Sequence, residues 1–181
     1  MNNKKVLITV PGHPDLRLRS INEKDIENLR TWKNANKNSF FLNQDITPEQ
    51  QQKWYNNFSS REHDHMFIVE QLADEKWQPV GCMGFRKLDD EGCVDAYNII
   101  RSRKIEPASF TMREVFKTML AYAAEMYPGL PLQVKVLSNN PAVDWYKKND
   151  FSIIDTVNNY YLMELNKNSV KEINWSVNKL L

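Results

Sequence analysis

The chain has 181 residues, with 24 Lys and Arg against 23 Asp and Glu and a formal net charge of +1. A chain of this length can bury a core without disulfides or metals, so we expect one compact domain. The balanced charge argues against a nucleic-acid or anionic-membrane partner, and the mean hydropathy of -0.62 argues against a membrane protein.

The N-terminus and the cysteines indicate a cytoplasmic protein. Residues 1–10 hold no apolar run long enough for a secretory signal. Cys82 and Cys93 lack the C-x-x-C spacing and have no histidine cluster beside them. We therefore expect two buried thiols, with no disulfide and no metal site.

The first half of the chain predicts strands, then two helices, then an antiparallel meander. Turn residues separate strands at 6–10 and 16–21. Apolar residues three apart predict a helix over 25–37, and the capping-box start Thr47-Pro-Glu-Gln50 predicts another through Phe58. Three further strands are expected at 65–71, 79–87 and 93–100.

The second half predicts a long helix over 111–126, which Pro128-Gly129 stops. A strand at 132–137, a short helix at 141–149 and a hairpin of strands at 152–157 and 160–165 follow. The tail at 170–181 has the spacing of a small amphipathic helix, which packs on its own domain or forms a partner or homodimer contact. We divide the chain into one domain, 1–166, and a C-terminal tail, 167–181.

The most informative segment runs from Asn139 to Phe151. It resembles the N-x-x-A-x-x-x-Y-x-K-x-G-F segment of the GNAT superfamily, the acetyl-CoA-dependent N-acetyltransferases, through Asn139, Ala142, Tyr146, Lys148 and Phe151. Trp32-Lys-Asn34 and the helix after Thr47 resemble one branch of that superfamily, which acts on ribosomal-protein N-termini and nucleotide-linked amino sugars. The resemblance implies an α/β fold with a mixed, mainly antiparallel central sheet flanked by helices.

The resemblance also implies roles for individual residues. Tyr146 would be the general acid that protonates the leaving thiolate of coenzyme A, because a tyrosine phenol carries its proton at neutral pH. The alternative is that Tyr146 packs its ring in the core with its hydroxyl at the rim of the core. Asn139 would cap the following helix or hydrogen-bond the pantetheine arm. Ile99 and Ile100 are the nearest matches to the strand whose backbone holds pantetheine and polarises the thioester.

The chain departs from the family in the loop that binds the pyrophosphate. Pro107, Phe110 and Met112 stand where that loop has a basic residue and two glycines. Backbone N–H groups at the helix start, at Thr111, Met112 and Arg113, remain available to phosphate. The nearby cationic side chains are Arg101, Arg103, Lys104 and Arg113, which bind phosphate in a remade site or are solvated surface charges.

The acceptor amine needs a base, for which Asp95 is preferred over Glu70. His63 and His65 share one side of an extended segment, but no third ligand stands near them, so we expect a polar strand entrance and not a metal site. Trp32 is expected in the core, and Phe40, Phe41 and Trp54 are candidates for an acceptor pocket.

The resemblance implies an enzyme that transfers an acetyl or related acyl group from coenzyme A to a primary amine, directly in a ternary complex. We favour a small-molecule acceptor such as an amino sugar, because no acidic run would attract a basic peptide. The alternatives are a protein N-terminal or side-chain amine as acceptor, and a non-catalytic module that binds a ligand without turnover.

Overall fold

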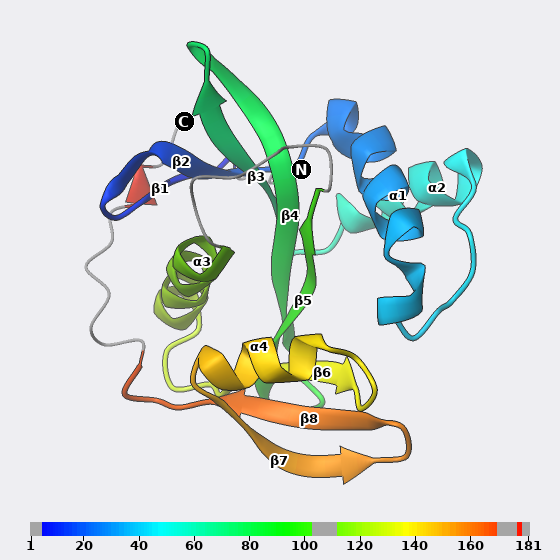
Figure 1. Ribbon diagram of the computed structural model, residues 1–181, viewed down its shortest axis with the longest axis vertical. Coiled ribbons are helices and arrows are strands. Elements are labelled where there is room, and N and C mark those ends of the chain that lie inside the picture. The colour runs from blue at the N-terminus through cyan, green and yellow to red at the C-terminus, as the bar shows by residue number, and fades with distance from the viewer. Residues whose placement is uncertain (1–4, 103–111, 170–176, 179–181) are drawn as a thin grey trace.

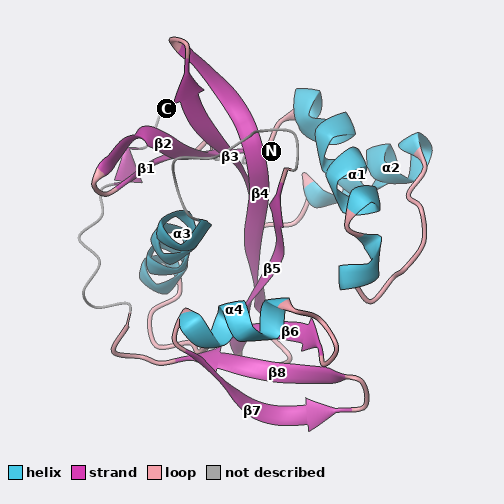
Figure 2. Ribbon diagram, in the orientation of Figure 1, coloured by secondary structure: helices cyan, strands magenta, loops and turns pink. Residues whose placement is uncertain are grey.

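One nine-stranded sheet organises the described residues, 5–102, 112–169 and 177–178, in this computed structural model, and helices cover both of its faces (Figures 1 and 2). The strand order is β7-β8-β6-β5-β4-β3-β2-β1-β9. Among the strands that the structure describes, only β5 and β6 pair in parallel. The mixed α/β fold with a mainly antiparallel sheet is therefore confirmed.

The elements follow the predicted order. The strands are β1 Leu7–Val10, β2 His13–Ser20, β3 Asp64–Ala73, β4 Lys76–Leu88, β5 Cys93–Arg101, β6 Leu132–Leu137, β7 Phe151–Val157, β8 Tyr160–Leu165 and β9 Val177–Asn178. The helices are α1 Ile26–Ala35, α2 Pro48–Phe58, α3 Met112–Met126 and α4 Ala142–Lys148, with the 3-10 turns η1 Glu23–Asp25 and η2 Lys37–Ser39 on either side of α1.

Local signals set several of these boundaries. The Thr47 hydroxyl accepts a hydrogen bond from the Gln50 N–H at 3.3 Å, and the Gln50 side chain accepts one from the Thr47 N–H at 2.9 Å. This capping box begins α2 where the sequence predicted it. Asn158, with a φ of 50°, turns the chain between β7 and β8 as expected for an Asn-Asn hairpin.

The larger core lies between the sheet and the pair α3 and α4. α3 contributes Val115, Phe116, Met119 and Leu120, each at most 2% exposed. Burial of these large side chains is the main force that holds the helix on the sheet. α4 joins the same core through Val143 and Tyr146, which places Tyr146 against the sheet on the α3 side.

A second core lies on the opposite face, under α1 and α2. Leu29 and Trp32 of α1 pack on the sheet with Met66, Ile68, Cys82 and Ile100, while Trp54 and Phe58 of α2 pack against this cluster. Trp32 is 6% exposed, which confirms its predicted core position. Both cysteines are buried and free, as expected, and burial raises the pKa of Cys82 to about 12.

The predicted helix over 170–181 is wrong at Val177 and Asn178. These residues form β9, which pairs antiparallel with β1 through Leu7 and Ile8. Without β9, β1 would expose the unpaired N–H and C=O groups of an edge strand, so pairing competes with the helix that the apolar spacing predicted. The rest of the segment lies outside the described residues, and the division at residue 166 stays a prediction.

Gly84 gives a direct test of how closely the central strands approach. A Cβ at this position would lie 2.6 Å from the His65 carbonyl oxygen and 2.8 Å from the Met66 sulfur. We predict that Gly84→Ala lowers the free energy of unfolding by about 1–3 kcal/mol, because β3 must shift to admit the methyl group. Urea denaturation measures this change. The exposed substitution Ser152→Ala in β7 serves as the control and should stay within about 0.5 kcal/mol.

Candidate active site

The parallel strands β5 and β6 are paired over only two residues. Val94 lies opposite Leu132 and Asp95 lies opposite Gln133, after which no further pairing joins the two strands, although β5 runs to Arg101. The outer edges of both are occupied, since β5 pairs with β4 and β6 pairs with β8. The inner edges of β5 and β6, which face each other in the middle of the sheet, therefore have backbone N–H and C=O groups without strand partners. A ligand can bind these groups.

A β-bulge in β5 lies beside this gap. Tyr97 pairs with Gly84 and Ile100 pairs with Cys82, so Asn98 and Ile99 together lie opposite Met83. Asn98 has a φ of 52°, and its backbone oxygen lies 3.5 Å from the Cys82 sulfur. Ile99 packs against the α3-side core, whereas Ile100 belongs to the α1-side core. The two residues predicted to contact pantetheine thus share a strand but direct their side chains to opposite faces.

Tyr146 is held in an aromatic cluster of the α3-side core. Its ring lies 6.1 Å from Phe116, 5.2 Å from Trp145 and 5.7 Å from Phe151, centroid to centroid. No described residue hydrogen-bonds its hydroxyl. Burial raises the pKa of Tyr146 well above that of an ordinary tyrosine, and the negative charge of Asp95 raises it further. The phenol is therefore protonated at neutral pH and has a proton to donate.

Asp95 lies on β5 where pairing with β6 ends, and it is 3% exposed. Its Oδ2 accepts a hydrogen bond from Arg86 Nε at 3.0 Å and lies 2.9 Å from Arg86 Nη2 in the same ion pair. Oδ1 has no hydrogen-bond donor among the described residues. Burial raises the pKa of Asp95, and this effect exceeds the opposing attraction of Arg86. Asp95 therefore keeps one oxygen that can accept a proton.

Glu70, the other candidate base, has both oxygens engaged. Arg17 Nε donates to Oε2 and Arg19 Nε donates to Oε1, each at 2.7 Å. Arg19 also binds Asp25 at 2.7 Å. This buried network ties β2 and β3 to the start of α1, so the geometry of Glu70 favours a structural role over that of a base.

A charged network beside Asp95 was not predicted from the sequence. Arg86 on β4 lies opposite both Asp64 of β3 and Asp95 of β5, and its guanidinium lies 4.9 Å from the Tyr97 ring centroid. The Tyr97 hydroxyl donates a hydrogen bond to Asp64. Burial, followed by the charge of Asp64, raises the pKa of Tyr97 well above its usual value. Only the strand register brings these side chains together, and no spacing in the sequence shows it.

The remaining predicted donor-site residues fall into three groups. Some are exposed at the edge of the sheet, some lie at the start of α3, and the others are outside the described residues. Because β5 and β6 are parallel, their carboxyl ends share one edge of the sheet, where Arg101 and Asn139 are both exposed. Arg113 is exposed in the first turn of α3, while Met112 is buried in the core. Arg103, Lys104, Pro107, Phe110 and Thr111 fall outside the described residues.

The capping of α4 differs from one of the two expectations for Asn139. The N-cap of α4 is Pro141, which makes no side-chain hydrogen bond to the helix, and the Oδ1 of the preceding Asn140 accepts a hydrogen bond from the Ala142 N–H at 2.9 Å. The exposed side chain of Asn139 has no hydrogen bond to a described residue. Of the two predicted roles, contact with pantetheine is the one that its position leaves open.

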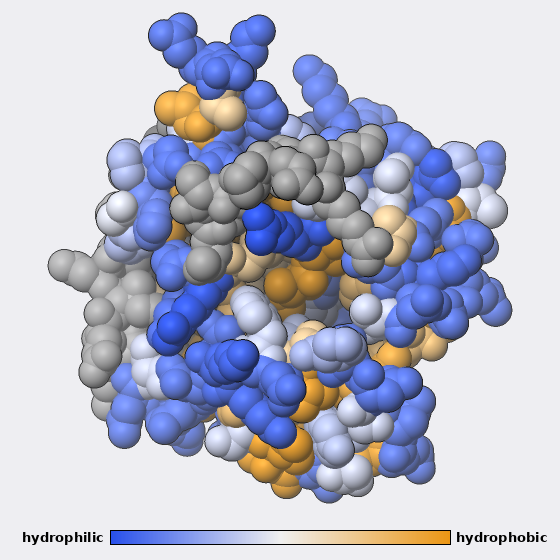
Figure 3. Space-filling view, in the orientation of Figure 1, coloured by the Kyte–Doolittle hydropathy of each residue, from blue (hydrophilic) through white to orange (hydrophobic). Residues whose placement is uncertain are grey.

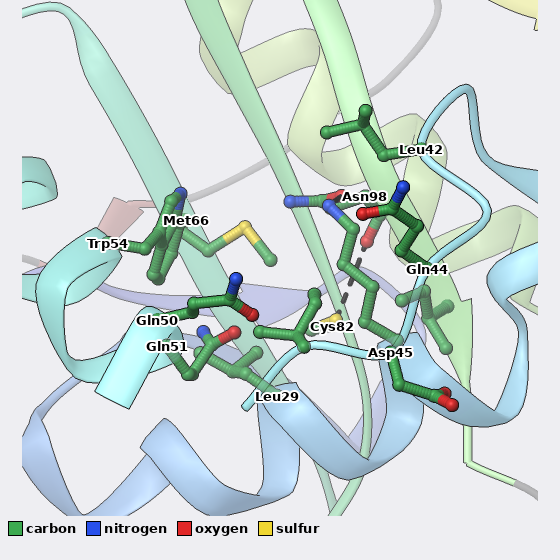
Figure 4. Close-up of a pocket in the computed structure, with 13 residues that line it drawn as sticks. Leu29, Leu42, Gln44, Asp45, Gln50, Gln51, Trp54, Met66, Cys82 and Asn98 are labelled. Atoms are coloured by element: carbon green, nitrogen blue, oxygen red, sulfur yellow. Dashed lines mark hydrogen bonds between the residues drawn. The ribbon is translucent and has the colours of Figure 1, made fainter. Parts of the chain in front are cut away.

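A pocket of about 320 Å³ lies on the other face of the sheet, between α1, α2 and strands β3 to β5 (Figure 4). The residues that line it are Leu29, Lys33, Leu42, Gln44, Asp45, Ile46, Gln50, Gln51, Trp54, Met66, Cys82, Asn98 and Ile100. Trp54 thus lines the pocket, whereas Phe41 is 53% exposed and contacts the Tyr160 ring edge-on. Asn98 belongs both to the lining of this pocket and to the bulge of β5.

Figure 3 shows a hollow near the centre of the viewed face, between α3, α4 and the pair α1 and α2. Apolar residues lie inside this hollow, and hydrophilic residues border it on the α3 side and on the side of α1 and α2. A hollow with apolar walls and a polar rim is typical of a small-molecule site.

The two histidines contact one tyrosine on the α3 side. His65 Nε2 lies 3.1 Å, and His63 Nδ1 3.3 Å, from the Tyr127 hydroxyl, and the His65 ring stacks on Phe85. Across the described residues, no group of three or more His, Cys, Asp or Glu is placed to hold a metal ion. None of the helices described here is both long and apolar enough to cross a membrane.

Comparison with known proteins agrees with this geometry. Residues 15–149 match the family model of the acetyltransferase (GNAT) domain. No protein in the curated set matches the chain by sequence.

Two solved structures share the fold. A nucleotide-linked sugar GNAT, apo FdhC, is 18% identical, with a TM-score of 0.68 over 87% of this chain and 90% of that one. Spermidine N-acetyltransferase from Vibrio cholerae, in complex with CoA and spermine, is 17% identical, with a TM-score of 0.71 over 87% of this chain and 99% of that one. The family match spans most of the sheet and both candidate catalytic residues, and the chain therefore belongs to the GNAT acetyltransferase family.

Proposed function

We propose that the protein transfers an acetyl group from acetyl-CoA to the primary amine of a small molecule. The observation that carries this proposal is the gap between β5 and β6, with Asp95 at its closed end. The Vibrio cholerae structure that shares the fold holds CoA, which supports the same donor here.

The free strand edges fit an acyl-CoA donor. Pantetheine carries amide groups, and the inner edges of β5 and β6 offer the backbone partners that amides need. Ile99 and Ile100 would contact this arm, and Asn139 stands at the open end of the gap. Arg101 and Arg113 would supply positive charge for the phosphates, together with the N–H groups of Met112 and Arg113 at the start of α3. Thr111 and Arg103, which the sequence also assigned to this role, lie outside the described residues.

The proposed chemistry uses two residues for proton transfer. Asp95 Oδ1 accepts a proton from the acceptor amine, directly or through water, as the nitrogen attacks the thioester carbonyl. A backbone N–H of β5 stabilises the negative charge that develops on the carbonyl oxygen. Tyr146 donates its proton to the sulfur as the C–S bond breaks, so one N–C bond forms, one C–S bond breaks and coenzyme A leaves as a thiol.

A small acceptor is favoured by the size of the pocket. About 320 Å³ lies at the low end of the range for small-molecule sites. The structures that share the fold include a nucleotide-linked sugar GNAT and a spermidine N-acetyltransferase bound to spermine, and neither name refers to a protein acceptor. A protein amine remains the second acceptor class, and a non-catalytic binding module remains the alternative from another class.

Donor binding separates the enzyme from a repurposed fold. We predict that calorimetry detects acetyl-CoA binding to the purified protein with a dissociation constant in the micromolar range, about 8 kcal/mol of binding free energy. Free coenzyme A serves as the control for recognition of the thioester. Absence of binding at millimolar acetyl-CoA would contradict the enzyme proposal and favour a different ligand.

Tyr146→Phe tests the general acid. The substitution removes the hydroxyl and keeps the ring in its aromatic cluster, so we predict a fall in kcat of about 100-fold or more with little change in melting temperature. Steady-state acetylation assays and thermal melting measure the two quantities. Tyr55→Phe on α2, away from the gap, is the matched control. Unchanged kcat in Tyr146→Phe would remove Tyr146 from the mechanism.

Asp95→Asn tests the balance between burial and ion pairing. A carboxyl group whose pKa is raised by folding binds its proton more tightly in the folded state, so its contribution to stability falls as the pH rises from about 4 through the raised pKa. We predict that Asp95→Asn becomes more stable relative to the natural protein between pH 4 and 7. The gain is about 1.4 kcal/mol for each unit by which the pKa is raised.

Urea denaturation across this pH range measures the difference. The opposite trend, in which Asp95→Asn loses relative stability as the pH rises, would show that attraction to Arg86 dominates and that Asp95 is a poor proton acceptor. Glu70→Gln is a useful comparison, because its carboxylate has guanidinium partners on both oxygens.

A further inference from the structure

Lys33 places a largely buried ammonium group in the wall of the pocket under α1 and α2. Its Nζ donates a hydrogen bond to Asn98 Oδ1 at 3.0 Å and lies 4.9 Å from the Phe40 ring centroid. No carboxylate of a described residue forms an ion pair with it. Burial lowers the pKa of Lys33, an effect that exceeds the opposing influence of Cys82, and the charge of Arg86 lowers it further. The pocket thus contains a desolvated cation whose protein contacts are a neutral amide and a ring.

An ammonium group has three N–H donors, and the hydrogen bond to Asn98 uses one of them. Burying a charge that lacks an opposite charge is costly, so such groups are usually paired or bind a ligand. The two remaining donors of Lys33 are available to a molecule in the pocket.

The other polar groups of the pocket are compatible with a negative ligand. Gln44, Gln50 and Gln51 contribute neutral amides, and Figure 4 shows them around the same space as Asn98. Asp45 is the acidic residue of the lining, but its side chain is 70% exposed and is ion-paired with Lys37 at 3.1 Å. The buried charge of the pocket therefore comes from Lys33.

We propose that Lys33 binds an anionic group, a phosphate or a carboxylate, on the acceptor substrate, so that the enzyme acetylates anionic amines in preference to neutral amines or polyamines. A polyamine would bring additional positive charge beside Lys33 and would be repelled. This inference rests on the proposed acetyl transfer, because it assigns the acceptor that the pocket selects. Lys33 acts here as a specificity residue and takes no part in proton transfer.

Matched acceptors that differ in one anionic group test the proposal. Glucosamine 6-phosphate is compared with glucosamine, and β-alanine with β-alaninamide, as acceptors of acetyl-CoA and as ligands in calorimetry. We expect kcat/KM for the anionic member of one pair to exceed that for the neutral member by about tenfold or more, the effect of one charge-assisted hydrogen bond. The pair that shows the preference identifies the anion as phosphate or carboxylate.

Substitutions then assign the preference to Lys33. Lys33→Met should reduce the ratio of the two kcat/KM values, and the ratio of the two affinities, to within about twofold of one. Lys33→Arg keeps the charge and should retain most of the preference. Lys53→Met, an exposed substitution on α2, should leave both ratios unchanged. Thermal melting confirms that each variant is folded, and we expect no loss of melting temperature for Lys33→Met.

The possible failures are distinguishable. Equal kcat/KM for the anionic and the neutral member in both pairs, a preference that survives in Lys33→Met, or no binding of either anionic probe at millimolar concentration would each overturn the role of Lys33. By contrast, Lys33-dependent binding of an anionic probe by a protein that does not bind acetyl-CoA would sustain the anion site and overturn the proposed acetyl transfer.

Discussion

The interrupted pairing of β5 with β6 is the constraint on which the proposed site depends. Two adjacent strands in the middle of a sheet normally satisfy each other's backbone groups, yet these two pair only at Val94 with Leu132 and at Asp95 with Gln133. The separation is maintained from both sides, because the antiparallel partners β4 and β8 hold the outer edges. The α3-side core anchors the residues next to the gap. A rigid frame around unpaired strand edges is what a ligand site made of backbone groups requires.

The two faces of the sheet have different proposed functions. α3 and α4 cover one face and hold Tyr146 among aromatic rings, where its phenol stays protonated. α1 and α2 cover the other face and enclose the pocket that contains Lys33 and Asn98. The bulge at Asn98 connects the faces, because its extra residue lets Ile99 and Ile100 enter opposite cores. A donor and an acceptor bound on opposite faces could meet at the gap.

Most of the fold could be predicted from the sequence, because helix and strand periodicities and capping residues such as Thr47 are local signals. The family resemblance was likewise visible around Tyr146, and the match over residues 15–149 confirms the family. The pairing of β9 with β1 could not be predicted, because strand partners distant in the chain leave no local pattern. The ion pair of Asp95 with Arg86, the positive φ of Asn98 and the missing carboxylate beside Lys33 depend on register and burial, which apolar spacing does not encode. The roles of the predicted site residues themselves stay predictions.

Hydrogen exchange with and without acetyl-CoA tests most directly whether the gap is the donor site. The account predicts that amides on the unpaired inner edges, within residues 96–101 of β5 and 134–137 of β6, become protected when acetyl-CoA binds. Their protection should depend on ligand concentration and be weaker with the nucleotide part of coenzyme A alone, which lacks the pantetheine arm. Binding of acetyl-CoA with protection confined to other parts of the sheet would contradict the account, because the free strand edges would then have no part in holding the donor.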